Sequence, residues 1–450
     1  MQTESGDTMK ISEMSESRLP IDSKDLFEQL CTEGMLMEGW KAVRRNRGTS
    51  GNDGQTVEVF ESRLREEIGK LKEELVSWQY EPQPVRRVEI PKPDGAGVRL
   101  LGVPNVRDRV VQTAIKQLLE PILDDTFSPN SYGFRPGKSQ RDAVEAAQRI
   151  VQSGKSYVVD IDLEKFFDRI NHDRLIGSLG KVIDDKRLLR LIGKTLRSGI
   201  MKDGLVTPTT EGTTQGSPLS PLLSNLVLDE LDKELEKRGL EHCRFADDCN
   251  IFAKSVKAAN RIMASISKFI EQKLKLKVNM EKSKVADSSL VKFLGMTIIE
   301  GTLAIAKKSI KRAMTKVKEF TPKGTHEKLE ATIKRINSWY VGWSNYYSMT
   351  QYPSQLAAIE AHIRRRLRSR IVEQQKSRRN LFNKLMKRGI ARAKAAATSF
   401  SNDKRWKLSH ANAVERAYPN KWFAEVVGLK IRSNEKQGHW FDTRKWVRLA

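Results

Sequence analysis

The sequence predicts an α+β fold, in which strands paired as antiparallel hairpins are flanked by helices and followed by an all-helical segment. Residues 85–103 and 243–252 each carry the signature of a β-hairpin. Apolar residues recur every three or four positions between residues 26 and 78 and again beyond residue 305, as they do in amphipathic helices. A chain of 450 residues has room for about three domains of the usual size.

The first half alternates helices with hairpins. Residues 26–78 predict two helices around the loop 47–54, whose Gly, Asn and Asp residues favour turns. Two β-branched runs flank Pro91-Lys92-Pro93-Asp94-Gly95 and predict the first hairpin. Residues 131–137 are too rich in Gly and Pro for a helix or a strand. The remaining elements expected are helices at 106–125 and 139–152, a buried strand at 157–163, and the second hairpin at 243–252.

Beyond residue 305 the sequence is helical and basic. One apolar stripe consists of Leu329, Ile333, Ile336, Tyr340, Trp343 and Tyr347. A second stripe consists of Leu356, Ile359, Ile363 and Leu367. The second helix also carries arginines that can bind RNA phosphates while the stripe packs: Arg364, Arg365, Arg366, Arg368 and Arg370. The last 70 residues lack long periodicity, so we expect a small separate module after a hinge near residues 374–379.

Positive charge is concentrated at the C-terminal end. The net charge is +25, and residues 305–450 hold 34 Lys and Arg against 10 Asp and Glu, whereas residues 1–304 hold 47 against 46. A neutral body with a basic end predicts nucleic acid as partner, because neutralised phosphates release condensed counterions. Six of the eight Trp lie in this end, where they suit base stacking, although packing is the commoner role.

Cysteine usage and hydropathy indicate the compartment. Cys31, Cys243 and Cys249 are too few and too scattered for a disulfide framework or a paired zinc site. No apolar run approaches the roughly 18 residues of a membrane span, and the first 23 residues lack the apolar centre of a signal peptide. We therefore expect a soluble cytoplasmic protein with no membrane contact and a disordered N-terminus over residues 1–25.

Four aspartates stand on the predicted strands and hairpin tip: Asp160, Asp162, Asp247 and Asp248. Transfer of a phosphoryl group from a nucleoside triphosphate to a 3′-hydroxyl builds charge on two oxygens, which a pair of Mg²⁺ ions stabilises. Mg²⁺ prefers carboxylate oxygens. Acidic turns often merely face solvent, and a lone aromatic-x-Asp-Asp is a weak signal. Apolar residues flank both acidic elements, which favours the metal site, because acids at the edge of a core are usually paired or bind metal.

A polar loop, residues 213–221, precedes the helix predicted to begin at Leu222. Its glycine and two prolines define a turn at the helix start. Such a loop can contact a phosphate or a base pair, or it can simply cap the helix, and the pattern leaves both interpretations open.

The order of these motifs resembles that of the reverse transcriptases encoded by bacterial group II introns, over almost the whole chain. The first hairpin, with Arg99-Leu100-Leu101-Gly102-Val103-Pro104, is similar to the family's first motif, which implies that Lys92 and Arg99 hold the incoming triphosphate. Tyr132-Gly133-Phe134-Arg135-Pro136-Gly137 resembles the second motif. Asp162-Leu163-Glu164-Lys165-Phe166-Phe167-Asp168 resembles the third, whose spacing selects Asp162 over Asp160 as the metal ligand.

The resemblance also implies roles for the remaining site residues. Phe167 is expected to be a steric gate against a 2′-hydroxyl, unless it is one more core aromatic. Gln215-Gly216-Ser217-Pro218 resembles the fourth motif, and Gln215 is expected near the sugar of the nucleotide. Phe245-Ala246-Asp247-Asp248 resembles the fifth, which in most members begins with Tyr. Residues 279–284, with Lys282 at the nucleotide, and 293–296 resemble the sixth and seventh. The two metal ions are expected at Asp162, Leu163, Asp247 and Asp248, of which the three aspartates are catalytic.

Downstream, residues 339–347 resemble the thumb helices that the family calls the maturase or X domain, and residues 406–429 resemble its DNA-binding module. The resemblance therefore implies a right-hand polymerase with a palm built on an antiparallel sheet. Its expected parts are a fingers extension at 26–84, fingers and palm at 85–304, a helical thumb at 305–378 and a basic DNA-binding module at 379–450. No Cys-rich nuclease domain follows, so target-strand cleavage is not expected.

The function implied is an RNA-directed DNA polymerase that also binds its group II intron RNA to assist splicing and mobility. Its partners would be template RNA, primer, target DNA and dNTPs, within a ribonucleoprotein. Two alternatives stay open: a splicing factor without synthesis, and a reverse transcriptase recruited by the host for repair or defence. Retention of the acidic residues and Gln215 favours activity. The sequence does not decide between monomer and dimer.

Overall fold

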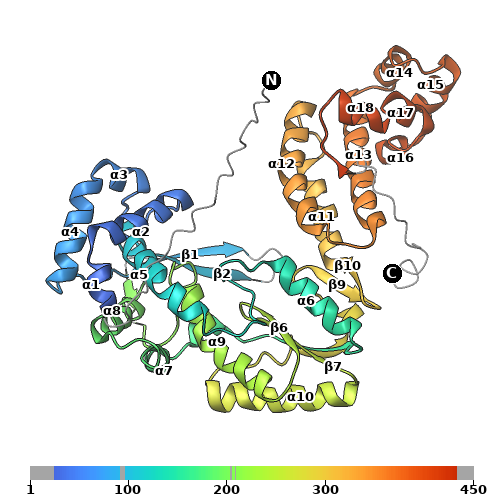
Figure 1. Cartoon of the computed structure of the whole chain (residues 1–450). Coiled ribbons are helices and arrows are strands. Elements are labelled where there is room, and N and C mark those ends of the chain that lie inside the picture. Colours follow the sequence, from blue (N-terminus) through green and yellow to red (C-terminus); the bar gives the residue numbers. More distant parts are fainter. Residues whose placement is uncertain (1–24, 92–96, 203–204, 208, 433–450) are drawn as a thin grey trace, which may run out of the picture.

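A computed structural model describes residues 25–91, 97–202, 205–207 and 209–432. Helices and strands are mixed up to residue 305, and helices alone follow, which confirms a mixed α and β architecture (Figure 1). Lys92, Trp440, Trp446 and the expected disordered N-terminus up to residue 24 lie outside the described residues. None of the helices in the described ranges is long and apolar enough to cross a membrane.

The N-terminal segment forms four helices where two were predicted. Thr32 divides the first predicted helix by capping α2, since its side chain accepts a hydrogen bond from the backbone N–H of Met35. A break at Arg63 divides the second predicted helix. The helices are α1 (Leu26–Leu30), α2 (Glu33–Asn46), α3 (Val57–Ser62) and α4 (Leu64–Val76).

The first predicted hairpin is confirmed and forms one edge of a small sheet. Strands β1 (Val85–Pro91) and β2 (Val98–Val103) pair antiparallel. Two short strands extend this sheet in the order β2-β1-β4-β5: β4 (Ile200–Lys202) and β5 (Leu205–Thr207).

The central sheet contains both predicted acidic elements. Strand β3 (Tyr157–Ile161) lies in its interior, paired antiparallel with β7 (Asp248–Ala253) on one side and β8 (Lys284–Asp287) on the other. Strand β6 (His242–Phe245) completes the order β6-β7-β3-β8. The predicted buried strand and second hairpin are therefore confirmed. A separate hairpin follows, β9 (Met296–Ile299) with β10 (Thr302–Ile305).

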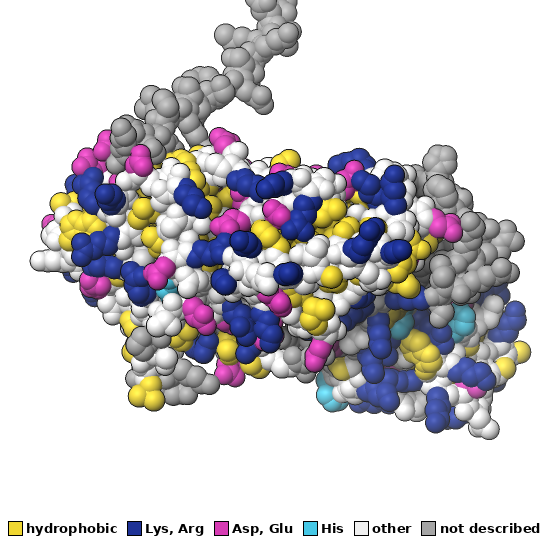
Figure 2. Space-filling view, turned by 90° about the horizontal axis from the view of Figure 1, so that it is seen from below, with side chains coloured by type: hydrophobic (Ala, Val, Ile, Leu, Met, Phe, Trp, Pro, Cys, Tyr) yellow, Lys and Arg dark blue, Asp and Glu magenta, His cyan; other side chains and the backbone are white. Residues whose placement is uncertain are grey.

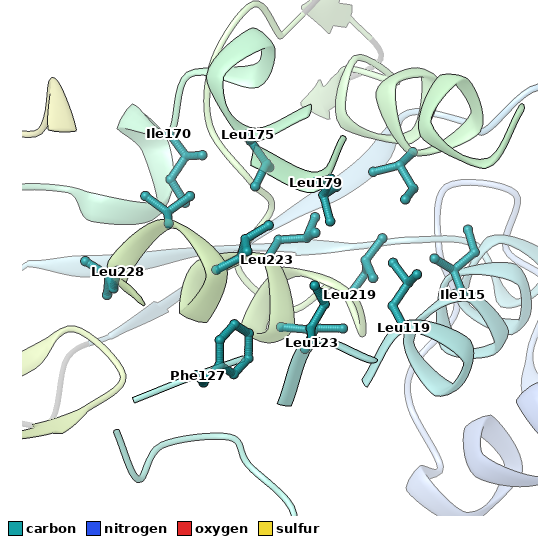
Figure 3. Packing of buried hydrophobic residues seen from close by; sticks show 14 of the residues in the cluster. Ile115, Leu119, Leu123, Phe127, Ile170, Leu175, Leu179, Leu219, Leu223 and Leu228 are labelled. Atoms are coloured by element: carbon teal, nitrogen blue, oxygen red, sulfur yellow. The ribbon is translucent and has the colours of Figure 1, made fainter. Parts of the chain in front are cut away.

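Helices cover both faces of the central sheet, because successive side chains of a strand point to opposite faces. Val158 and Phe252 pack with the helix α6, whereas Val159 and Ile251 belong to the main core. In that core, α5, α7 and α9 bring apolar side chains such as Leu119, Leu175 and Leu223 together (Figure 3).

The helices that surround the two sheets are α5 (Val106–Asp124), α6 (Gln140–Gln152), η1 (Phe166–Arg169), α7 (His172–Leu179), α8 (Lys186–Leu196), α9 (Ser220–Lys237), α10 (Val256–Phe269), η2 (Ile270–Leu274) and η3 (Ser288–Leu290).

The remaining helices form what we call the C-terminal helical body. They are α11 (Lys307–Phe320), α12 (Leu329–Tyr347), α13 (Pro353–Gln374), α14 (Arg378–Lys387), α15 (Arg392–Ser399), α16 (Arg405–Leu408), α17 (Asn412–Ala417) and α18 (Asn420–Glu425). Both predicted stripes lie on helices, and Ile336, Tyr340, Ile363 and Leu367 are fully buried.

The helices after residue 378 are not separate from those before it. Leu385, Val414 and Phe423 belong to the same hydrophobic cluster as Ile336 and Leu367. The expected hinge near residues 374–379 is a short connection between α13 and α14. One hydrophobic core therefore joins α11–α13 to α14–α18, and the expected DNA-binding module at 379–450 stays a prediction.

Candidate active site

The structure brings the acidic hairpin tip beside the end of β3. Phe245 and Asp248 are paired at the ends of β6 and β7, so Ala246 and Asp247 form a two-residue turn. Ala246 has φ of 57°, in the left-handed region that tight hairpin turns require. Ile161, the last residue of β3, is paired with Cys249 of β7, so Asp162 follows directly at the same edge of the sheet. Antiparallel pairing thereby collects Asp162, Asp247 and Asp248.

Asp162 is held by the segment that precedes β8. Its backbone N–H donates to Oγ of Ser283 at 3.0 Å, and its carbonyl accepts from the N–H of Asn279 at 2.8 Å. The Nζ of Lys282 lies 4.0 Å from Oδ1 of Asp162. The sixth motif therefore fixes the backbone of the third, and it places the predicted nucleotide-binding Lys282 next to Asp162.

Burial and mutual repulsion raise the pKa values of these carboxyl groups. Burial, opposed by Lys284, raises the pKa of Asp160 to about 6. Burial, together with the charges of Asp247 and Asp160, raises the pKa of Asp248 to about 6. The pKa of Asp247 is also raised, by burial first and then by Asp162, although Arg99 acts in the opposite direction. Each pKa is raised mainly because burial disfavours the charged carboxylate, with repulsion from neighbouring carboxylates added, and a bound cation would offset both.

The chemistry of this donor set fits Mg²⁺, which takes carboxylate oxygens. Asp162, Asp247 and Asp248 would hold it. Leu163 has a buried apolar side chain, so only its backbone carbonyl can be a ligand. Within the described ranges, no three Asp, Glu, His or Cys side chains converge closely enough to form a complete metal site. The two-ion arrangement therefore stays a prediction.

Two of the predicted nucleotide-binding residues, Phe167 and Gln215, meet at the loop 209–217. The carbonyl of Gln215 accepts from the N–H of Gly102 on β2 at 2.8 Å, and the N–H of Thr213 donates to the carbonyl of Phe167 at 2.6 Å. Gly216 has φ of 109°, and a Cβ there would lie 2.8 Å from the carbonyl oxygen of Gly102. The loop therefore lies directly between β2, which carries Arg99, and the segment after Asp162.

Phe167 itself is neither fully buried nor fully exposed, and it packs edge-on against Phe166. Phe166 is the buried member of the pair. Phe167 packs against the main core as well, with part of its surface accessible, so both interpretations of Phe167 stay open. Its role as a gate stays a prediction.

The predicted RNA-binding arginines of α13 make protein contacts. Arg368 is 6% exposed and donates to the carbonyl of Tyr418 at 2.9 Å, and Arg370 is 2% exposed and bonded to Thr332. Arg364 is also buried. Arg368 and Arg370 are thus engaged by the protein itself, because a helix packed on two sides has few faces left for solvent. RNA binding by these residues stays a prediction.

Arg365 and Arg366 are the better exposed members of the set. Arg365 lies over the ring of Trp406, with 4.2 Å between Cζ and the ring centroid. Arg366 donates to the hydroxyl of Thr321 at 2.9 Å. Arg365 also lines a hollow between α13 and α17 together with Arg364 and Arg368. RNA binding by Arg365 and Arg366 likewise stays a prediction.

A wide groove, which we call the basic groove, runs between α11, α12 and the loop 292–295. Lysines from α11 line one wall, and the rings of Trp339, Trp343, Tyr346 and Tyr347 line the other. Figure 2 shows Lys and Arg over much of the visible surface, including its lower right part. Flat rings next to cations suit nucleic acid. The predicted stripe had assigned Trp343 and Tyr347 to the core, whereas both also reach this groove.

Two groups near the acidic turn were not predicted. Lys292 lies close enough to act on the pKa values of Asp160 and Asp248, and it also lines the basic groove. Arg244, which directly precedes Phe245, is completely buried. A charged residue between apolar residues of a predicted strand was the available signal, because a buried charge requires a partner.

Two family models match separate stretches of the chain. Residues 90–298 match the family model of reverse transcriptases (RNA-dependent DNA polymerases), and residues 310–389 match the maturase-specific domain of group II introns. The second match extends past residue 378, where a domain boundary was expected.

Individual relatives agree with these models. Protein YkfC of Escherichia coli is 34% identical over 290 residues, covering 56% of this chain and 76% of that protein. The group II intron-encoded protein LtrA of Lactococcus lactis is 33% identical, covering 50% of this chain and 37% of LtrA. A putative intron 2 protein of yeast COX1/OXI3 is 31% identical, covering 61% of this chain and 32% of its own length. The chain therefore belongs to the reverse transcriptases of the group II intron type, with a maturase-specific domain.

Proposed function

We propose that this chain is an RNA-directed DNA polymerase with a right-hand arrangement. In this proposal the central sheet is the palm, β1 and β2 belong to the fingers, and α11–α13 form the thumb. The observation that carries the proposal is the edge of the central sheet, where pairing of β3 with β7 brings Asp162 beside the turn of Asp247. The family match to reverse transcriptases covers this whole region.

In this proposal the site residues have two tasks: they bind the substrates and they stabilise negative charge. Two Mg²⁺ ions, when bound, would stabilise the attacking and leaving oxygens of the phosphoryl transfer. Asp162, Asp247 and Asp248 would hold them. Lys282 and Arg99 would balance the negative charge of a triphosphate, since Lys282 lies 4.0 Å from Asp162 and Arg99 is close enough to lower the pKa of Asp247. Gln215 would contact a sugar in the hollow that it lines beside Gly102. Phe167 would exclude a 2′-hydroxyl there by contact.

We further propose that the C-terminal helical body binds RNA, including a group II intron RNA. The basic groove supports this, because it combines lysines with four aromatic rings and leads to the loop 292–295 beside the acidic turn. The maturase-specific match begins at residue 310, within α11. Such a surface could hold the product duplex during synthesis and the folded intron during splicing.

Primer extension tests the polymerase assignment. The full chain should extend a DNA primer on an RNA template with dNTPs and Mg²⁺. Asp247→Asn should lower the extension rate by about 10²–10³-fold or more, because it removes a charge that acts on the transition state. Asp173→Asn, an exposed carboxylate on α7, is the matched control and should retain activity. Extension by Asp247→Asn at the wild-type rate would refute the proposal.

A further inference from the structure

The turn that carries Asp247 rests on a buried ion pair. Arg244 on β6 and Asp232 on α9 are both 0% exposed. Nε of Arg244 lies 2.8 and 2.9 Å from the two carboxylate oxygens of Asp232, and Nη2 lies 2.5 Å from Oδ2. Burial is the largest influence on Asp232 and acts to raise its pKa, but Arg244 and His242 together outweigh it, so the pKa is lowered. Both groups are therefore charged in the interior, two residues from the turn.

The remaining nitrogen of Arg244 reaches the turn itself. Nη1 donates to the carbonyl oxygen of Ala246 at 2.9 Å and to Oδ1 of Asn225 at 3.0 Å. Ala246 is the residue in the left-handed conformation, and Asp247 follows it. A guanidinium is planar and has several donors in a fixed geometry, so it can bind Asp232 and the turn at once. A lysine ammonium has one nitrogen and cannot span both.

A second support comes from the loop of the second motif. The N–H of Tyr132 donates to the carbonyl of Arg244 at 2.8 Å, and Nδ2 of Asn225 donates to the carbonyl of Gly133 at 2.8 Å. A Cβ on Gly133 would lie 2.3 Å from the backbone nitrogen of Ala246. The backbone of this loop therefore lies directly against the turn, and Asn225 connects it to Arg244.

We propose that Arg244 is a positioning residue for DNA synthesis, which fixes the Ala246-Asp247 turn through the Ala246 carbonyl. The inference rests on the proposed polymerase function. Asp232 orients the guanidinium, and Asn225 ties it to the loop at Gly133. The buried pair then keeps the carboxylate of Asp247 in one place relative to Asp162. A loose turn would misplace a group that must act on the transition state, which lowers kcat more than the KM for dNTPs.

Arg244→Lys tests the geometry with the charge retained. We expect kcat to fall by about tenfold to a hundredfold, since a displacement of about 1 Å can cost that much, while the KM for dNTPs changes by less than about threefold. Arg174→Lys is the matched control, because Arg174 also pairs with a carboxylate of α9, Glu230, but makes no contact with the turn. The control should keep the wild-type kcat.

A double substitution separates positioning from folding. Arg244→Met with Asp232→Leu replaces the ion pair by apolar side chains, an exchange that is often neutral or stabilising for the fold. The variant also loses the hydrogen bonds to Ala246 and Asn225, so its Tm should fall. At temperatures where circular dichroism shows that it is folded, it should have the low kcat and faster hydrogen exchange of the 243–252 peptide. Wild-type kcat in a folded double variant would overturn the proposal. Absence of synthesis by the wild-type chain would instead refute the polymerase assignment, and the exchange measurement would still report on the turn.

Discussion

The central sheet and the C-terminal helical body use charge in opposite ways. At the edge of the sheet, burial and neighbouring carboxylates raise the pKa values of Asp160 and Asp248 to about 6. In the helical body, lysines of α11 and aromatic rings of α12 line the basic groove. Lys292 belongs to both regions. We therefore expect the sheet edge to determine the rate of DNA synthesis and the helical body to determine the affinity for RNA. A substitution should then be able to abolish one property and leave the other intact.

The largest effect is expected from Asp162→Asn. Loss of this carboxylate should reduce primer extension by about 10²–10³-fold or more, because a charge that acts on the transition state is removed. RNA affinity, measured by filter binding, should stay within about twofold of wild type, because few phosphate contacts lie at the sheet edge. A parallel loss of binding would show that the two regions are not independent. Asp173→Asn again serves as the control.

Leu367→Ala should destabilise the helical body as one unit. Leu367 is fully buried in the cluster shared by α11–α13 and α14–α18. The free energy of unfolding should fall by about 2–5 kcal/mol, measured by urea denaturation. Hydrogen exchange should accelerate in α13 and in α17 together. If α14–α18 kept their protection, a separate module after residue 378 would be supported instead. Val341→Ala, on an exposed position of α12, should change stability by less than about 0.5 kcal/mol.

Charge reversal in the basic groove should weaken binding in a salt-dependent way. Lys308→Glu with Lys311→Glu places two acids on the wall formed by α11. The slope of log K against log salt concentration should become shallower by about 2, since about one counterion is released per phosphate contact. The kcat of primer extension at saturating template should remain near wild type. The reversal Lys257→Glu with Lys268→Glu, on α10, should leave the slope unchanged. Equal slopes for both variants would refute the assignment of the groove.

The smallest effect concerns pH. Asp160 and Asp248 are protonated in the folded chain below about pH 6. Mg²⁺ must then displace a proton, so the concentration of Mg²⁺ for half-maximal extension should rise severalfold as pH falls from 7 to 5.5. Asp160→Asn removes one like charge beside Asp248 and should shift this rise to lower pH. A Mg²⁺ requirement independent of pH would contradict the role of Asp248.

The same pKa values predict the stability of the metal-free chain. Between about pH 4 and 6 the folded chain binds more protons at Asp160 and Asp248 than an unfolded chain does, because the unfolded pKa is about 4. Their contribution to the free energy of unfolding therefore decreases as pH rises through this window. Thermal unfolding at pH 5 and pH 7 without Mg²⁺ can detect it, with Asp160→Asn as the comparison.

Sequence alone determined the local elements around the site. The alternation of β-branched residues around Pro91–Gly95 and the apolar arms around Asp247 predicted both hairpins, and the structure confirms them. The spacing of apolar residues and the turn-forming residues depend on a few neighbouring positions, so they can be recognised before the fold is known. The four N-terminal helices were predicted as two, because the threonine cap at Thr32 and the single non-helical residue Arg63 are weaker signals than a glycine-rich loop.

Only the tertiary structure decided which of these residues meet. The register of β3 with β7 places Asp162 beside Asp247, and the packing of α13 between α12 and the last helices buries Arg364, Arg368 and Arg370. The tertiary structure also shows that Arg244 is buried and bonded to Asp232 and to the Ala246 carbonyl, which the sequence did not indicate. The sequence does not show whether a charged side chain is buried, because its burial and its partners depend on contacts between segments far apart in the chain.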